Sequence, residues 1–175
     1  LGQLKGVRVF VSGFAVRPGS YTVSALSTIA NAVVRAGGPS ASGSFRNIQL
    51  RRGNKLIATL DFYDLLLNGD RSADLLVQAD DVVHIGPIGQ QVGVIGSVNR
   101  PAIFELRPGE TMADALRMAG GFAAVADASR LSLERVDERT TVRVTQVETS
   151  QAATLQLQNG DVLRAFNIVT LATSG

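Results

Sequence analysis

The chain has 175 residues and a formal net charge of +2, from 17 basic and 15 acidic side chains. This small excess, with Arg51-Arg52 as the only adjacent basic pair, argues against a nucleic-acid partner, because such proteins concentrate basic residues on one face or in one run. The absence of cysteine excludes disulfides, thiolate metal sites and cysteine nucleophiles, and no apolar run approaches the roughly 18–20 residues that span a bilayer.

The first predicted elements form a β-hairpin, in keeping with a glycine-rich chain that lacks tryptophan. Apolar and polar residues alternate over 7–11, as in a strand with one buried face. Gly13 marks a bend, and Arg17-Pro18-Gly19 predicts a type II turn, because proline fixes φ at one central position and glycine accepts a positive φ at the next. A short strand through Tyr21 completes the hairpin.

A helix is predicted next. Thr28-x-x-Asn31 is a weak capping box, and Ile29, Val33 and Ala36 lie one above the other on a single face. The Ala-Gly-Gly triplet that follows predicts the end of the helix, because glycine adopts the left-handed conformation found there.

The rest of the first half is predicted as strands at 47–52, 55–60 and 81–85, with one more short helix between the last two. This helix lies in DFYDLLLNGD, with Asp61 at the N-cap and Asn68-Gly69 at the end. We expect the apolar side chains of this helix to close the core of the module, and contact with a neighbouring subunit is the alternative. The side chains concerned are Phe62, Leu65 and Leu66.

The second half repeats the first at a shift of 83, which becomes 80 after a contraction of three residues. Val9, Val11, Gly13, Arg17, Pro18 and Tyr21 fall on Val92, Val94, Gly96, Arg100, Pro101 and Phe104. In the second copy Thr111-x-x-Asp114 is the capping box, strands are predicted at 130–136, 140–147 and 161–165, and Ala102 replaces the turn glycine, which predicts another turn type. The sequence thus predicts two α+β domains, 1–88 and 89–175, each a mixed β-sheet with one main helix in the β-grasp arrangement.

These motifs resemble those of the SLBB (soluble-ligand-binding β-grasp) domain. The similar elements are VxVxGxVxRPGxY, a helix ending in Ala-Gly-Gly, a strand with an arginine, and a late Gly-Asp element. Two departures are Ala79-Asp80-Asp81 in place of the late Gly-Asp, and the missing Pro-Gly turn in the second copy. Tandem copies are similar to those of Wza-type bacterial polysaccharide export proteins.

The resemblance implies a non-catalytic periplasmic segment of a longer, outer-membrane-anchored capsular or exopolysaccharide exporter, in keeping with a chain that begins at Leu1. The implied partners are a bacterial polysaccharide, further copies of the full-length protein in a ring, and an inner-membrane export or copolymerase protein. A binding module for a soluble small molecule or oligosaccharide is the alternative, and an adaptor in an enzyme complex is a third.

Candidate contact residues are few. Arg17 and Arg100, like Arg52 and Arg135, occupy the same place in both copies, so we interpret them first as parts of the shared fold; contact with carboxylates or phosphates of an acidic polysaccharide stays open. Arg51 beside Arg52, and Phe62 and Tyr63 in the segment specific to the first copy, complete the set.

No catalytic, cofactor or metal site is predicted. The single histidine, His84, has no cluster of further ligands around it in the sequence and reads as a polar position on a strand. Asp80 and Asp81 are adjacent on a strand and point to opposite faces, which disfavours acid–base catalysis by the pair.

Overall fold

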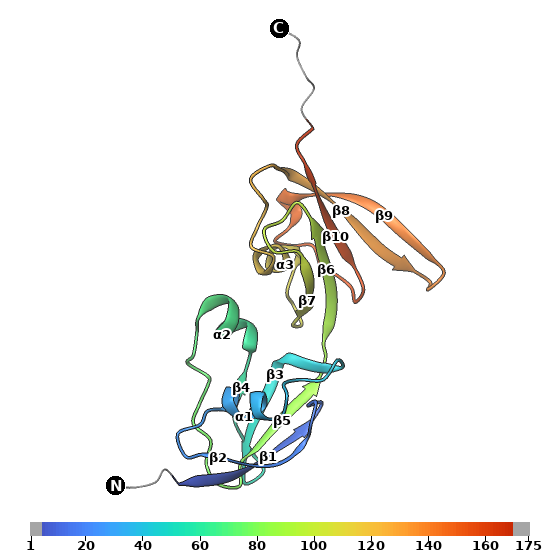
Figure 1. Ribbon diagram of the computed structural model, residues 1–175. Coiled ribbons are helices and arrows are strands. Elements are labelled where there is room, and N and C mark those ends of the chain that lie inside the picture. The colour runs from blue at the N-terminus through green and yellow to red at the C-terminus, as the bar shows by residue number, and fades with distance from the viewer. Residues whose placement is uncertain (1–4, 170–175) are drawn as a thin grey trace. The chain divides into compact units, whose positions relative to one another are not determined.

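Figure 1 shows the computed structural model of the chain, in which residues 5–169 are described. The chain divides between Ile88 and Gly89 into two compact units, called unit 1 and unit 2 in chain order. Unit 1 contains β1 (Gly6–Gly13), β2 (Gly19–Ser24), α1 (Ile29–Arg35), β3 (Gly43–Arg52), β4 (Lys55–Leu60), α2 (Phe62–Asn68) and β5 (Val82–Pro87). Unit 2 contains β6 (Gln90–Gly96), β7 (Ala102–Leu106), α3 (Met112–Met118), β8 (Ala126–Asp137), β9 (Thr141–Glu148), the 3-10 turn η1 (Thr149–Gln151) and β10 (Val162–Asn167).

Each unit is built on one mixed sheet of five strands. The strand order is β2-β1-β5-β3-β4 in unit 1 and β7-β6-β10-β8-β9 in unit 2, so the two orders correspond strand for strand. The first and last strands of each unit run parallel at the centre, and the other neighbours are antiparallel. The α+β fold class, with two tandem β-grasp modules, is confirmed.

One face of each sheet packs against its helix and forms the core. In unit 1 the buried side chains of the sheet alternate along each strand and meet the buried face of α1. They include Val9, Val11, Ile48, Leu50, Val83 and Ile85 from the sheet and Ile29, Ala32 and Val33 from the helix. Burial of each large aliphatic side chain contributes about 1.5–3 kcal/mol, so the core determines which strand face turns inward. The opposite face, which we call the open face, carries the alternate side chains of each strand that point away from this core.

Both main helices begin and end as the repeat predicts. Capping boxes are present at Thr28 and at Thr111. At the end of α1 the amide of Gly38 donates to the carbonyl of Val33 at 2.9 Å and that of Gly37 donates to Val34 at 3.0 Å, the Schellman pattern. The α3 end repeats this pattern, so the Ala-Gly-Gly triplets are confirmed as stop signals.

The predicted type II turn is wrong. Gly19 has φ of 156°, far from the value of about +80° that a type II turn needs, and it pairs with Val11 as the first residue of β2. The linking loop is fixed instead by the helix end: the amide of Arg17 donates to Ala36 at 2.9 Å and that of Arg100 to Ala119 at 2.8 Å. Both loops therefore dock on equivalent carbonyls at the ends of their helices.

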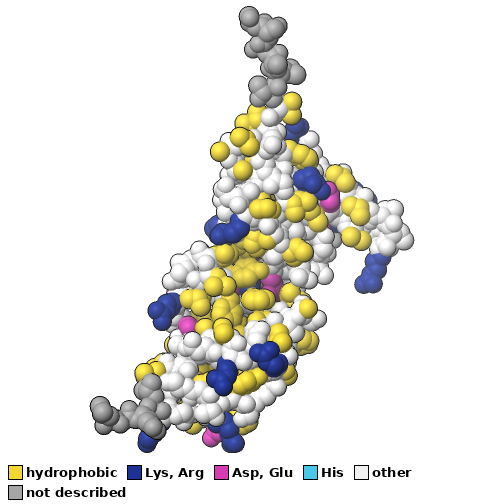
Figure 2. All heavy atoms as spheres, in the orientation of Figure 1, with side chains coloured by type: hydrophobic (Ala, Val, Ile, Leu, Met, Phe, Trp, Pro, Cys, Tyr) yellow, Lys and Arg dark blue, Asp and Glu magenta, His cyan; other side chains and the backbone are white. Residues whose placement is uncertain are grey.

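Among the described residues there is no helix that could span a membrane, and the face seen in Figure 2 shows no single basic patch. The three α-helices have seven residues each, and none is long and apolar enough to cross a membrane. On the face seen in Figure 2 the Lys and Arg side chains are spread as separate positions. This distribution agrees with the small net charge of the chain.

Candidate functional site

Arg52 and Arg135, which occupy equivalent positions near the ends of β3 and β8, stabilise the fold of their units. Arg52 donates from Nε to Asp81 Oδ1 at 2.9 Å and from Nη2 to Oδ2 at 3.0 Å, and Asp81 is fully buried. Arg135 donates to Asp161 in the same two-point way, at 3.1 and 2.8 Å. A hydrogen bond to the aspartate raises the pKa of each arginine above its usual range. Two-point pairing with a buried carboxylate leaves these guanidinium groups engaged within the protein.

Arg17 and Arg100 lie on the loops that dock on the helix ends. Arg100 donates from Nε and Nη2 to the carbonyl of Met118, at 3.3 and 3.1 Å, and so caps the end of α3. Arg17 lies beside the matching helix end, since a Cβ added to Gly37 would come within 3.1 Å of its guanidinium. Both residues are exposed on the surface. Helix-end contacts explain why the two copies share this arginine.

Phe62 and Tyr63 start α2, the helix specific to the first copy. Asp61 is its N-cap and accepts from the amide of Tyr63 at 2.9 Å, and the helix ends at Gly69 with φ of 67°, as predicted. Phe62 is buried in the core, which supports the core-closing interpretation, whereas the expected core position of Leu66 is wrong because its side chain is 69% exposed.

A buried ion pair holds this helix against β3. The Nε of Arg46 lies 3.0 Å from Asp61 Oδ2, both side chains are almost fully buried, and the Arg46 guanidinium lies 4.6 Å from the ring centre of Tyr63. Burial raises the pKa of Asp61 and the charge of Arg46 opposes the rise. Tyr63 is therefore engaged in packing α2 onto its own unit.

Arg51 has different surroundings from its neighbour Arg52. Leu50 points into the core, so alternation along β3 places Arg51 on the open face of the sheet. There its Nε donates to Gln49 Oε1 at 3.0 Å, and no acidic group within residues 5–169 forms an ion pair with it. Of the candidate residues predicted from the sequence, Arg51 is the one with a charge left unneutralised on a half-buried surface.

Three polar side chains that sequence reasoning did not select lie next to it. Strand register places Gln49 opposite His84 on one side, and Ser12 opposite His84 on the other. Ser12 Oγ and His84 Nδ1 are 2.8 Å apart. We call Ser12, Gln49, Arg51 and His84 the open-face cluster. It joins residues up to 72 positions apart in the chain.

The equivalent place in unit 2 is neutralised internally. At the shifts of 83 and 80, Arg51 corresponds to Glu134 and His84 to Arg164. Arg164 donates from Nε to Glu134 Oε1 at 3.3 Å. The same two positions therefore carry an acid–base pair in unit 2 and two basic side chains in unit 1.

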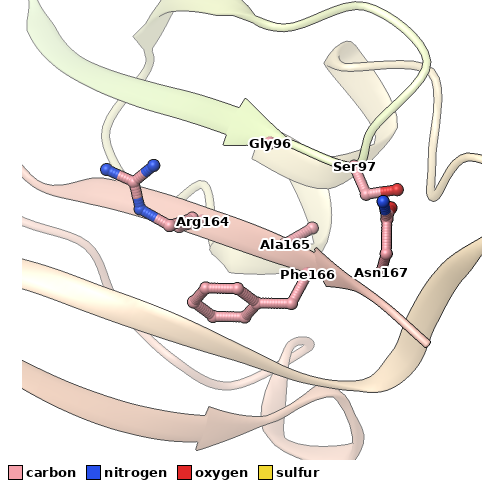
Figure 3. Close-up of a pocket in the computed structure, with 6 residues that line it drawn as sticks. All are labelled: Gly96, Ser97, Arg164, Ala165, Phe166 and Asn167. Atoms are coloured by element: carbon pink, nitrogen blue, oxygen red, sulfur yellow. The ribbon is translucent and has the colours of Figure 1, made fainter. Parts of the chain in front are cut away.

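A shallow depression in unit 2 is a weaker candidate for a binding site than the open-face cluster. Its volume is about 390 Å³, and Gly96, Ser97, Arg164, Ala165, Phe166 and Asn167 line it. In Figure 3 Ser97 and Asn167 project at one end and Arg164 at the other, and Arg164 is paired with Glu134. Its polar groups therefore do not converge on one point. Within residues 5–169, no group of three or more His, Asp or Glu side chains is placed to hold a metal ion.

Both units resemble known proteins. The family model described as the SLBB domain matches residues 8–60 and 91–145, one segment in each unit and together more than half of the chain. Two curated relatives, both described as polysialic acid transport protein KpsD from Escherichia coli, are 32% identical to the chain over 106 residues. These residues are 60% of this chain and 19% of each relative, so the chain spans less than a fifth of the length of the relatives it matches.

Proposed function

Because the chain belongs to the SLBB domain family, we propose that it is the non-catalytic, periplasmic segment of a protein that exports a capsular or extracellular polysaccharide. The observation that carries this proposal is the similarity to proteins described as transporting polysialic acid. Two complete β-grasp units with separate sheets also support a structural role. The proposed partners are the polysaccharide, further copies of the full-length protein and an inner-membrane export or copolymerase protein, with an outer-membrane anchor outside this segment.

Lateral assembly into a translocon ring is the finer part of the proposal. Its support comes from the β8–β9 hairpin, which extends beyond the rest of the unit 2 sheet (Figure 1). Val136, Val142 and Val144 lie on one face of this hairpin by register and are 51–64% exposed. An edge strand with exposed apolar side chains is a surface on which another chain can pair or pack. We propose that neighbouring copies meet there.

Deletion of the segment tests the export function. In the organism that carries this chain, the coding sequence for residues 5–169 is removed in frame, and surface polysaccharide is measured by immunostaining or acid-sugar analysis. We expect loss from the surface with retention of polymer inside the cell. Surface polysaccharide at the level of the parent strain would overturn the proposal.

A charge placed on the hairpin tests assembly. Val142→Lys in the full-length protein is expected to reduce ring particles seen by electron microscopy and mass photometry, because Val142 lies opposite Val136 and a lysine buried there without a partner opposes association. Val34→Lys, on the exposed face of α1, is the matched control and should leave assembly unchanged. Equal assembly by both variants would show that the hairpin is not part of the interface.

A second candidate is a binding module for a soluble small molecule or oligosaccharide. The open-face cluster favours it, since it gathers hydrogen-bonding side chains on a surface not needed for the core. Calorimetric titration of the chain with small metabolites separates the two. Saturable one-to-one binding with micromolar affinity, together with normal export after deletion, would favour this candidate.

A further inference from the structure

The open-face cluster of unit 1 has a charge that the fold does not require. In unit 2 the equivalent positions hold Glu134 and Arg164, whose side chains meet at 3.3 Å and neutralise each other. Their pairing proves that side chains at these two positions reach a common point above the sheet. In unit 1 the same two positions hold Arg51 and His84, which both present nitrogen atoms and have no acid between them.

Neighbouring cations are already paired, Arg8 on the open face and Arg46 and Arg52 on the core face of β3. Arg52 binds Asp81, Arg46 binds Asp61, and the Nη2 of Arg8 lies 3.6 Å from Asp80. Arg51 is half-buried, which makes an unneutralised charge more costly than at a fully exposed position. An external anion would remove this imbalance.

Two side chains of the cluster, Gln49 and Ser12, position the hydrogen-bond donors of Arg51 and His84. Gln49 accepts from the Nε of Arg51 at 3.0 Å, which fixes the guanidinium and leaves its Nη groups as donors. Ser12 lies 2.8 Å from Nδ1 of His84. With the serine hydroxyl donating to Nδ1, the imidazole carries its hydrogen on Nε2 and donates from there. His84 and Arg51 are diagonal neighbours across the β3–β5 pair, a spacing of about 7–8 Å between Cα atoms that a two-oxygen group can bridge.

We propose that the open face of unit 1 binds the carboxylate of an acidic saccharide, with Arg51 and His84 as donors and Gln49 and Ser12 as positioning residues. The planar fork of arginine matches two oxygens of a carboxylate or of a phosphate, and the phosphate probe in the titration below separates these two anions. The saccharide part of the proposal rests on the proposed export function, whereas the carboxylate part rests on the cluster alone. The open, shallow face binds each carboxylate weakly, which suits a polymer that presents one such group after another.

Titration of the 175-residue chain followed by NMR of ¹⁵N-labelled protein tests the site. The probes are tri-galacturonate, the neutral maltotriose of equal length, sodium acetate and inorganic phosphate, all at one ionic strength. We expect tri-galacturonate to shift amide signals on β3 and β5, with at least tenfold weaker effects from maltotriose and acetate. Arg51→Gln should weaken binding about 10-fold or more, since a hydrogen bond to a charged group is lost.

Two further variants make the result specific. Arg71→Gln removes the same charge from an exposed position of unit 1 outside the cluster and should change the affinity less than twofold. The double variant Arg51→Glu/His84→Arg places the unit 2 pair on unit 1, so it should fold, as judged by tyrosine fluorescence, and fail to bind. Glu134→Arg in unit 2 should create a second responding face on β8 and β10.

The outcomes separate the two proposals. Equal losses in Arg51→Gln and Arg71→Gln, or binding by the double variant, would overturn the site and leave the export function standing. A response to acetate or phosphate equal to that of tri-galacturonate would overturn the saccharide assignment. Selective binding through Arg51 in a protein whose deletion leaves export intact would uphold the site and overturn the export function.

Discussion

Replacement of Arg52 and replacement of Asp81 are expected to lower the stability of unit 1 by different amounts, although the two residues form one ion pair. The carboxylate of Asp81 is fully buried, whereas 35% of the Arg52 side chain is exposed. Besides Arg52, the amide of Gln78 donates to this carboxylate, at 2.7 Å. Loss of the arginine therefore leaves a buried charge behind, while loss of the aspartate leaves a cation that can reach water.

The expected magnitudes follow from this difference. In Arg52→Met the Asp81 carboxylate stays buried without its ion partner, so this variant is expected to lose the most unfolding free energy of the three. Asp81→Asn keeps an oxygen for the Gln78 amide and removes the charged hydrogen bonds, which costs about 1–3 kcal/mol. Arg8→Met is the matched control: its pair with Asp80 is exposed on both sides, so its loss costs less than about 1 kcal/mol.

Urea unfolding monitored by tyrosine fluorescence measures this order. The chain has no tryptophan, and its two tyrosines, Tyr21 and Tyr63, both lie in unit 1, so the signal reports on that unit alone. A loss in Asp81→Asn as large as that in Arg52→Met would refute the reasoning from burial. A loss in Arg52→Met no larger than that in Arg8→Met would refute the structural role of the pair.

Three further predictions concern single positions. Gly13→Ala should cost at least about 2 kcal/mol more than Gly69→Ala in urea unfolding, because both glycines have positive φ but only at Gly13 would an added Cβ clash with a backbone oxygen, that of Ile85. Gly160→Asp should cost about 1 kcal/mol or less and Gly160→Val clearly more by circular dichroism, because Asp80 adopts the left-handed conformation at the equivalent place in unit 1, with φ of 66°. Hydrogen bonding by the Thr111 amide lowers the pKa of Asp114 in the folded protein. The ionised carboxylate therefore stabilises the folded protein above the unfolded pKa of about 3.9, and this stabilisation is lost as pH falls through the folded pKa. The difference in unfolding free energy between the parent protein and Asp114→Asn should shrink below about pH 4, and a difference that stays constant would contradict this prediction.

The repeat made the elements of the fold predictable. Capping boxes at Thr28 and Thr111 indicate where the two main helices begin. The Ala-Gly-Gly triplets indicate where they end, because glycine adopts the left-handed conformation found there. Such signals act over a few residues and are readable in sequence. The loop at Arg17 is different: hydrogen bonds to a helix end some twenty residues away fix its course, and turn propensities do not encode them. The beginning of β3 at Gly43 was also missed, because a register irregularity separates that residue from the regular ladder at Ile48.

The candidate site was predictable only in part. Leu50 as a core residue implies that Arg51 and Arg52 point to opposite faces, so their different roles follow once strand alternation is applied. The contact of Ser12 with His84 depends on the parallel pairing of β1 with β5 and has no local signal. One signal was present in the repeat: the shifts that match Asp81 with Asp161 also replace Arg51 and His84 by Glu134 and Arg164.

The contrast between the copies separates what the fold needs from what a partner needs. The Arg–Asp pairs at Asp81 and Asp161 have buried carboxylates, so loss of the arginine is costly, and both copies keep these pairs. The Arg164–Glu134 pair is partly exposed to solvent, and pairs of this kind contribute about 0–1 kcal/mol. Folding therefore tolerates either choice on the open face and cannot explain why unit 1 places two donors there. We attribute the difference to an anion that meets one unit and not the other.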